Sequence, residues 1–208
     1  DLIAISFVKT AETVNHLKSY LKSKCLDGQR VVPGVVSKIE SPDSLDNLDD
    51  IVAASDAVMV ARGDLGSQIP LEDVPVVQQQ ITAACRRLNK PCIVASHLLR
   101  SMLEHPTPTR AEVADIADVV QQRADALMLS GESAAGLHPM KSLDVLRAVA
   151  LRTEQQQLEY GGHQAGGGVA SGMLERLYRE KSGETKISEQ EYISEGLCAS
   201  AAHLAEQL

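Results

Sequence analysis

Five short apolar runs, each followed by a segment with helical periodicity, constrain the fold of this chain more than any other feature. The runs cover Leu2–Val8, Val31–Glu40, Ala57–Ala61, Cys92–Ser96 and Ala126–Leu129. The helical segments cover Thr10–Lys22, a helix opened by Ser41-Pro42, Pro75–Asn89, Arg110–Gln122 and Pro139–Gln157. A regular alternation of strand and helix predicts a parallel sheet covered by helices.

The spacing of the runs favours part of a (β/α)8 barrel. Successive runs begin about 25 to 35 residues apart, close to the repeat of a barrel that places roughly 250 residues over eight units. Five units cannot close eight strands, so an α/β fold consisting of a partial TIM barrel is expected over residues 1–157. A five-stranded doubly wound sheet is the alternative, but it usually carries its phosphate-binding glycines after the first strand. Here they follow the third.

The chain changes character after residue 157. Residues 158–188 include a tract, 160–172, with six of the fourteen glycines, and are predicted to form a linker or loop. Residues 189–208 have helical periodicity and are predicted to be the first helix of a second, truncated α/β domain. The chain begins without Met inside an apolar run, so we expect it to be part of a longer polypeptide.

Composition excludes several classes of partner. A net charge of −8 argues against nucleic acid or an anionic membrane surface, because both require a basic footprint. No apolar run is long enough to span a bilayer. Four cysteines, Cys25, Cys85, Cys92 and Cys198, are scattered without metal-ligand spacing, which predicts free thiols in a reducing compartment.

Candidate functional residues come from the carboxyl ends of the strands, where a barrel gathers its chemistry. The polar residues at these ends are Ser6, Lys9, Lys38, Glu40, Arg62, Asp64, Ser96, His97, Ser130 and Glu132. Glu40 and Asp64 end neighbouring strands and could both ligate one hard cation such as Mg²⁺ or Mn²⁺. Lys38 precedes Glu40 by two residues and therefore shares its face of the strand. A purely ionic cluster is the structural alternative.

The stretch Asp56–Pro70, DAVMVARGDLGSQIP, adds a predicted anion site. Gly63 and Gly66 would let backbone N–H groups approach an anion, and Leu65–Ile69 would form a short helix whose N-terminus faces it. A metal-binding acid, Asp64, lies within the same few residues. The alternative is an ordinary strand that ends in a Gly-Asp turn.

Four motifs, in this order, resemble pyruvate kinase. They are SKIES (Ser37–Ser41), MVARGDLG (Met59–Gly66), PTPTRAEVAD (Pro106–Asp115) and ALMLSGESA (Ala126–Ala134). The resemblance covers residues 1–157 strongly and 189–208 weakly. It corresponds to the second part of the catalytic barrel and the start of the C-terminal domain. Gln68 in GDLGSQIP is similar to plastid-type plant enzymes.

The resemblance implies phosphoryl transfer from phosphoenolpyruvate to ADP, giving pyruvate and ATP in glycolysis. By its motifs, Lys38, Ser96 and Ser130 would be catalytic. Substrate would be bound by Lys38, Gly63, Asp64 and Ser96, and Mg²⁺ or Mn²⁺ by Glu40 and Asp64. The family also implies K⁺ at a site outside this chain, allosteric control, and a homo- or hetero-oligomer, typically a tetramer. A plastid location (chloroplast stroma) is expected, with the cytoplasm as the alternative.

Two departures from the family pattern keep other readings open. His97 replaces a usual Gln and Arg100 a usual Glu, which is expected to change loop or subunit contacts. The alternatives are a non-catalytic assembly subunit related to pyruvate kinase and a Mg²⁺-dependent barrel lyase acting on pyruvate or phosphoenolpyruvate. Because the nucleotide site has no counterpart here, residues 1–208 alone are expected to be inactive.

Overall fold

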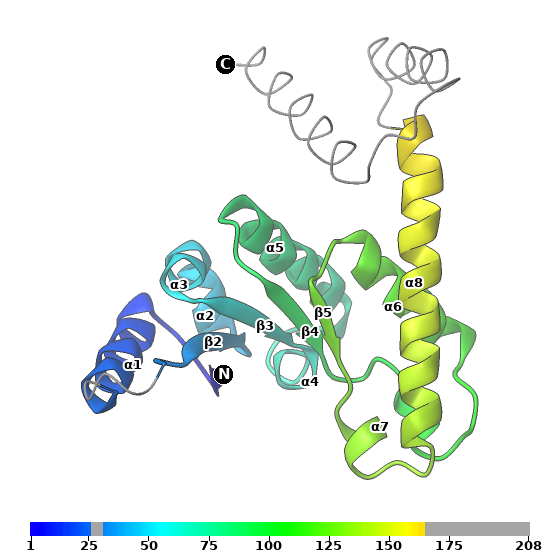
Figure 1. The fold of residues 1–208 in the computed structure, drawn as a ribbon, viewed down its shortest axis with the longest axis horizontal. Helices are drawn as coiled ribbons and strands as arrows, with labels where there is room; N and C mark the ends of the chain where they lie inside the picture. The colour runs from blue at the N-terminus through cyan, green and yellow to red at the C-terminus, as the bar shows by residue number, and fades with distance from the viewer. Residues whose placement is uncertain (26–30, 165–208) are drawn as a thin grey trace. The chain divides into compact units, whose positions relative to one another are not determined.

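Five parallel strands form a single sheet in the computed structural model, which describes residues 1–25 and 31–164. The strands are β1 Leu2–Ile5, β2 Gly34–Ile39, β3 Ala57–Ala61, β4 Cys92–Ala95 and β5 Ala126–Met128. Each strand pairs with the next one along the chain (Figure 1). A doubly wound sheet reverses its strand order part-way, whereas this order runs in one direction like the wall of a barrel. The predicted partial (β/α)8 barrel is confirmed.

Helices follow every strand. They are α1 Ala11–Lys24, α2 Pro42–Asp46, α3 Leu48–Ala54, α4 Arg62–Leu65, α5 Val74–Arg87, α6 Arg110–Gln121, α7 Gly131–Ala134 and α8 Pro139–Gln164, with 3₁₀ turns η1 Leu71–Asp73 and η2 Arg100–Leu103. The helices α1, α3 and α5 pack beside one another over the sheet (Figure 1). Within the described ranges, no helix has both the length and the apolar character needed to cross a bilayer.

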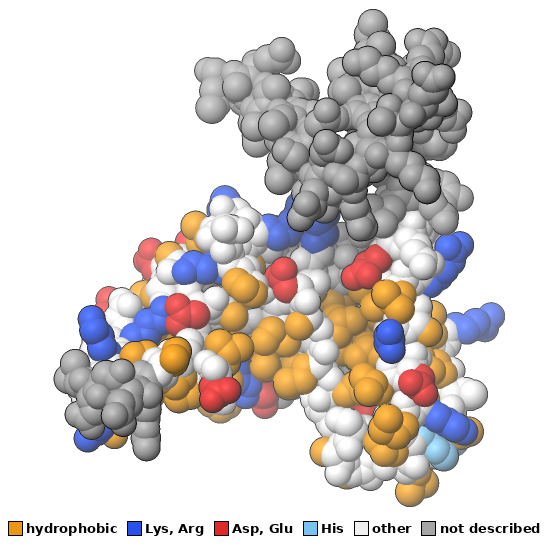
Figure 2. Space-filling model, viewed as in Figure 1, with side chains coloured by type: hydrophobic (Ala, Val, Ile, Leu, Met, Phe, Trp, Pro, Cys, Tyr) orange, Lys and Arg blue, Asp and Glu red, His pale blue; other side chains and the backbone are white. Residues whose placement is uncertain are grey.

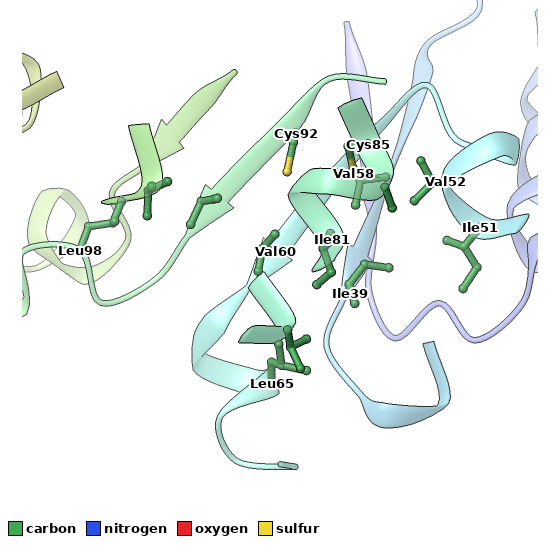
Figure 3. Packing of buried hydrophobic residues seen from close by; sticks show 14 of the residues in the cluster. Ile39, Ile51, Val52, Val58, Val60, Leu65, Ile81, Cys85, Cys92 and Leu98 are labelled. Carbon is green, nitrogen blue, oxygen red and sulfur yellow. The ribbon is translucent and has the colours of Figure 1, made fainter. Parts of the chain in front are cut away.

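The two faces of the sheet carry different apolar clusters, because side chains alternate along a strand. Val58 and Val60 of β3 belong to a large cluster with the helices, which includes Ile81 of α5 (Figure 3). Ala57 and Met59 belong to a small cluster on the other face, completed by Val36, Ala95 and Ile93. The larger cluster is the core that anchors the strands, and therefore fixes where each strand ends.

The structure changes several predicted boundaries. β1 ends at Ile5 rather than Val8, because Phe7 takes a left-handed backbone with φ of 52°. The helix expected after Ser41-Pro42 is divided into α2 and α3 at Asn47, whose side-chain amide donates to the Lys9 carbonyl (3.1 Å). The predicted helix at Leu65–Ile69 is wrong. The turn of helix lies earlier, at Arg62–Leu65.

The predictions for the cysteines and for the chain from α8 onward are confirmed only in part. Cys25, Cys85 and Cys92 are free thiols, as expected, while Cys198 lies outside the described residues. In α8, Leu146 is buried but Leu143 and Leu151 remain about half exposed. The helix continues to Gln164, past its predicted end near residue 157. The proposed division into a linker and a C-terminal helix falls mainly on residues beyond 164, outside the described part, and stays a prediction.

Candidate active site

The carboxyl ends of the strands deliver the predicted site residues to one edge of the sheet. β3 shows most clearly how the chain does this. All five of its residues are buried, and the strand stops where Arg62 begins the short helix α4. Gly63 and Asp64 therefore sit directly beyond a strand that the core holds on both faces. Lys38 and Glu40 occupy the corresponding end of β2, its parallel neighbour.

Lys38 and Glu40 form the central ion pair of this edge. Lys38 Nζ lies 2.5 Å from Glu40 Oε1, and the side chains are 24% and 1% exposed. Lys38 shares the strand face of Val36, on the inner side of the barrel wall. The same amine donates to the Ser6 hydroxyl at the end of β1 (2.9 Å). The ion pair between Lys38 and Glu40 confirms the prediction that both side chains lie on the same face of the strand.

The other oxygen of Glu40 is bound by the backbone of the preceding unit. Phe7 N–H donates to Glu40 Oε2 (2.6 Å), and Phe7 is the residue with positive φ. The early end of β1 thus provides a donor for a buried carboxylate, which would otherwise be costly to desolvate. Glu40 is fixed on both oxygens, and each oxygen retains a further lone pair.

Gly63 and Asp64 present backbone donors in the first turn of α4. Their N–H groups have no acceptor among the described residues, as expected at the start of a helix. The N–H of Gly66 instead donates to the Arg62 carbonyl (2.9 Å). The Gly66 N–H is therefore not free to contribute to the predicted anion cradle, whereas the roles of Gly63 and Asp64 in that cradle stay predictions. The Asp64 side chain is exposed and has no hydrogen-bond or ion-pair partner in the described part of the chain.

Ser96 lies against this cradle from the neighbouring strand. A Cβ atom added to Gly63 would lie 3.5 Å from both Cβ and Oγ of Ser96, and 3.6 Å from Cε1 of His97. Ser96 and His97 both have positive φ, 77° and 57°. Arg100 Nη1 donates to His97 Nε2 (2.9 Å). The two departures from the family pattern are therefore in contact with each other, beside the candidate site.

Ser130 is held in place by a buried acid. Glu132, 2% exposed, accepts from Ser130 N–H through Oε2 (2.9 Å) and from Leu99 N–H through Oε1 (3.1 Å). One carboxylate thus ties the end of β5 to the loop that follows β4. Among the residues that the structure describes, neither the Ser130 hydroxyl nor the Ser96 hydroxyl has a hydrogen-bond partner.

The structure gathers several of the predicted residues into two contact groups rather than one, and the first group also includes Phe7, which was not predicted. The first group is Ser6, Phe7, Lys38 and Glu40, and the second is Gly63, Ser96 and His97. Asp64 follows Gly63 of the second group, while in the described part of the chain Ser130 has no hydrogen bond to either group. Lys9, another polar residue near a strand end, instead pairs with Asp43 on the surface (2.6 Å).

Glu40 and Asp64 carry the type of donor that a hard divalent cation prefers. Within the described ranges, no cluster of three or more His, Cys, Asp or Glu side chains could hold a metal. The two carboxylates follow neighbouring strands, and among the described residues the Asp64 carboxylate has no hydrogen-bond or ion-pair partner. Mg²⁺ and Mn²⁺ accept such oxygen donors and commonly complete their shell with water or substrate oxygens.

Sequence reasoning missed the residues that support the site. Phe7 acts through its backbone, which no side-chain pattern reveals. Arg62 and Glu132 were recognised only as polar residues at strand ends, with no role assigned. Asp115, the partner of Arg62 (2.7 Å), lies 53 residues away. The position of Arg62 directly after a fully buried strand could have indicated a structural role, because a charge in such a place needs a partner.

Comparison with known proteins settles the family. Residues 1–143 match the family model described as pyruvate kinase, barrel domain. The chain belongs to the pyruvate kinase family. It is 54% identical over all 208 residues to pyruvate kinase isozyme A, chloroplastic, of Ricinus communis, and 51% identical to that of Nicotiana tabacum. These matches cover 33% and 32% of the two relatives.

Further relatives agree with this assignment. Plastidial pyruvate kinase 3, chloroplastic, of Arabidopsis thaliana is 53% identical over 154 residues, 74% of this chain and 26% of that protein. A solved pyruvate kinase from Cryptosporidium parvum superposes with a TM-score of 0.73 at 36% identity, covering 74% of this chain and 32% of that one. The chain spans about a third of the length of the relatives that it matches end to end.

Proposed function

We propose that this chain forms part of an active pyruvate kinase, which transfers a phosphoryl group from phosphoenolpyruvate to ADP and yields pyruvate and ATP. The observation that carries the proposal is the Lys38–Glu40 pair at the carboxyl end of β2, in which a buried carboxylate is held by the Phe7 N–H and by a partly exposed amine that also donates to Ser6. A structural pair would gain little from such burial, since apolar residues of similar size often stabilise a core as well. A cation and an acid held in fixed geometry suit phosphoryl transfer.

Each remaining site residue takes a role consistent with its position. Lys38 stabilises the negative charge of the transferring group. The free N–H groups of Gly63 and Asp64 bind the substrate carboxylate. Ser96 and Ser130, whose hydroxyls have no partner in the described structure, take part in the proton relay that protonates the enolate methylene.

Glu40 and Asp64 are the residues that would hold Mg²⁺ or Mn²⁺. The ion, when bound, supplies positive charge that neutralises the anionic substrate. Phe7 N–H and the Lys38 amine orient the Glu40 carboxylate toward that position, and Asp64 completes the protein's contribution from the next strand.

The wider context follows from the relatives. The relatives are named as chloroplastic or plastidial enzymes, which supports a plastid location for this chain. ADP, K⁺, an effector and partner subunits in an oligomer belong to the proposal as family expectations, and no residue described above is assigned to them. Glycolysis is the pathway to which the proposed reaction belongs.

The test uses the complete polypeptide that contains this chain. Pyruvate formation from phosphoenolpyruvate is measured with and without ADP, alongside Lys38→Met and a surface control, Lys9→Met. ADP-dependent pyruvate formation that Lys38→Met abolishes and Lys9→Met retains supports the proposal. ADP-independent formation would instead indicate the lyase. Mn²⁺ and substrate-analogue binding without turnover, or no binding at all, would point to the assembly subunit.

A further inference from the structure

Arg62 is a buried cation that the roles above do not use. Its side chain is 9% exposed and follows β3 directly. The guanidinium donates twice to the Ser96 carbonyl, from Nε (3.0 Å) and from Nη2 (2.8 Å). Two donors from one rigid plane hold a carbonyl oxygen in both distance and direction, which a lysine ammonium cannot reproduce.

The backbone that Arg62 holds is strained. Ser96 and His97 are consecutive non-glycine residues with positive φ, a conformation that persists only where the surroundings impose it. The turn packs against Gly63, and the Ser96 hydroxyl lies 3.5 Å from the position that a Cβ on Gly63 would take, which is an ordinary contact distance. The Arg62 contacts supply the restraint that the turn requires.

The guanidinium is itself oriented by two helices. Nη1 donates to Asp115 Oδ1 of α6 (2.7 Å) and to Gln78 Oε1 of α5 (3.4 Å). Gln78, 2% exposed, also donates to Gln122 Oε1 (3.0 Å). These contacts join the ends of β3 and β4 to the two helices that cover them. The guanidinium therefore has little freedom to turn away from Ser96.

We propose that Arg62 is the positioning residue of the Ser96 hydroxyl. By holding the Ser96 carbonyl, it fixes the left-handed turn and keeps the hydroxyl beside the Gly63–Asp64 cradle. The inference rests on the proposed function, in which Ser96 serves proton transfer. Because the cradle binds the substrate carboxylate through backbone groups of α4, loss of Arg62 affects turnover more than substrate binding.

A double-mutant cycle in the complete polypeptide tests this role. Arg62→Lys, Ser96→Ala and the double variant are compared with Arg87→Lys, a matched control in an exposed ion pair with Asp49. Arg62→Lys is expected to lower kcat about tenfold with little change in KM for phosphoenolpyruvate. In the Ser96→Ala background the same change should cost less than about twofold, because the two residues act as a unit. Arg87→Lys should change neither constant.

Several outcomes would overturn the inference. An unchanged kcat in Arg62→Lys would do so, as would an equal loss with and without the Ser96 hydroxyl, which indicates a merely structural role. Thermal unfolding of each variant checks folding, and Asp115→Asn replaces Arg62→Lys if the latter does not fold. An inactive wild-type protein would refute the proposed function and this inference together, whereas an active wild type with additive losses refutes this inference alone.

Discussion

At the scale of single residues, buried carboxylates organise the candidate site. Glu40 accepts from Lys38 and from Phe7 N–H, and Glu132 accepts from Ser130 and Leu99 N–H. In both cases a carboxylate that follows one strand accepts from a backbone N–H that follows the neighbouring strand. Buried anions satisfied by backbone donors fix loop geometry closely, since any shift leaves a charge unpaired. The two carboxylates therefore fix the backbone that follows the strands.

The role of Glu132 can be tested by a substitution at Gly136. A Cβ at Gly136 would lie 2.5 Å from the Glu132 carbonyl oxygen and 3.2 Å from its carbonyl carbon, both backbone atoms. We expect Gly136→Ala to displace α7, to weaken both Glu132 hydrogen bonds and to cost about 1–3 kcal/mol. Thermal or urea unfolding measures this loss. Gly63→Ala is the control, because its nearest atoms lie at an ordinary 3.5 Å; equal stability losses would contradict the prediction.

At the scale of elements, the N-terminus of α6 carries an extensive cap. Thr109 and Glu112 form a capping box, in which each side chain accepts from the backbone N–H of the other residue. Glu112 also accepts from the N–H and the hydroxyl of Ser101 (2.7 and 2.5 Å). The cap thus joins α6, which carries Asp115, to the turn that follows Ser96. The element that orients Arg62 is therefore anchored at its N-terminus, through Thr109 and Glu112.

The cap predicts a pH dependence of stability. Burial alone would raise the pKa of Glu112, but hydrogen bonds from Ser101 and Thr109 hold the pKa below its usual value. A lowered pKa in the folded state stabilises the protein above the ordinary glutamate value, about 4.3, and this contribution is lost as the pH falls through the folded pKa. We expect Glu112→Gln to cost about 1–2 kcal/mol at pH 7, and less at pH 3.

Urea unfolding at both pH values measures this effect, with Glu104→Gln as control, since that exposed acid is in the same loop. A Glu112→Gln loss that is the same at pH 3 and pH 7 would show that the carboxylate charge does not matter. A loss equal to that of Glu104→Gln would show that the cap does not matter.

How much the sequence could predict differs between elements for physical reasons. β3 was predicted with its exact bounds because every side chain in it is buried and apolar. β1 was predicted too long, because its end depends on Phe7 N–H reaching Glu40, 33 residues away. The turn Arg62–Leu65 was placed too late, since local propensity does not record the contacts of Arg62. The sequence therefore predicted an acid and a lysine that the structure brings into contact, whereas the long-range hydrogen bonds that hold them could not be predicted from it.

At the scale of the whole molecule, the sheet has two open edges within the described part of the chain. β1 and β5 occupy its edges, and Leu2, Ile3 and Met128 are 61%, 37% and 40% exposed. Figure 2 shows hydrophobic side chains gathered over the middle of the face in view. An edge with free backbone groups beside exposed apolar side chains is prone to pair with other chains. The described sheet resembles a section of a barrel wall that needs further strands.

Residues 1–208 expressed alone should therefore associate and should not convert phosphoenolpyruvate to pyruvate. Five strands cannot close an eight-stranded barrel, and the inner face, where Lys38 lies, stays open to water. In an open site the Lys38 charge is screened, so its interaction with a phosphoryl group is much weaker than in a closed one. Light scattering after size exclusion and a coupled pyruvate assay test both statements, with the complete polypeptide as control. A stable monomer with measurable turnover would show that this part of the barrel wall is sufficient for catalysis.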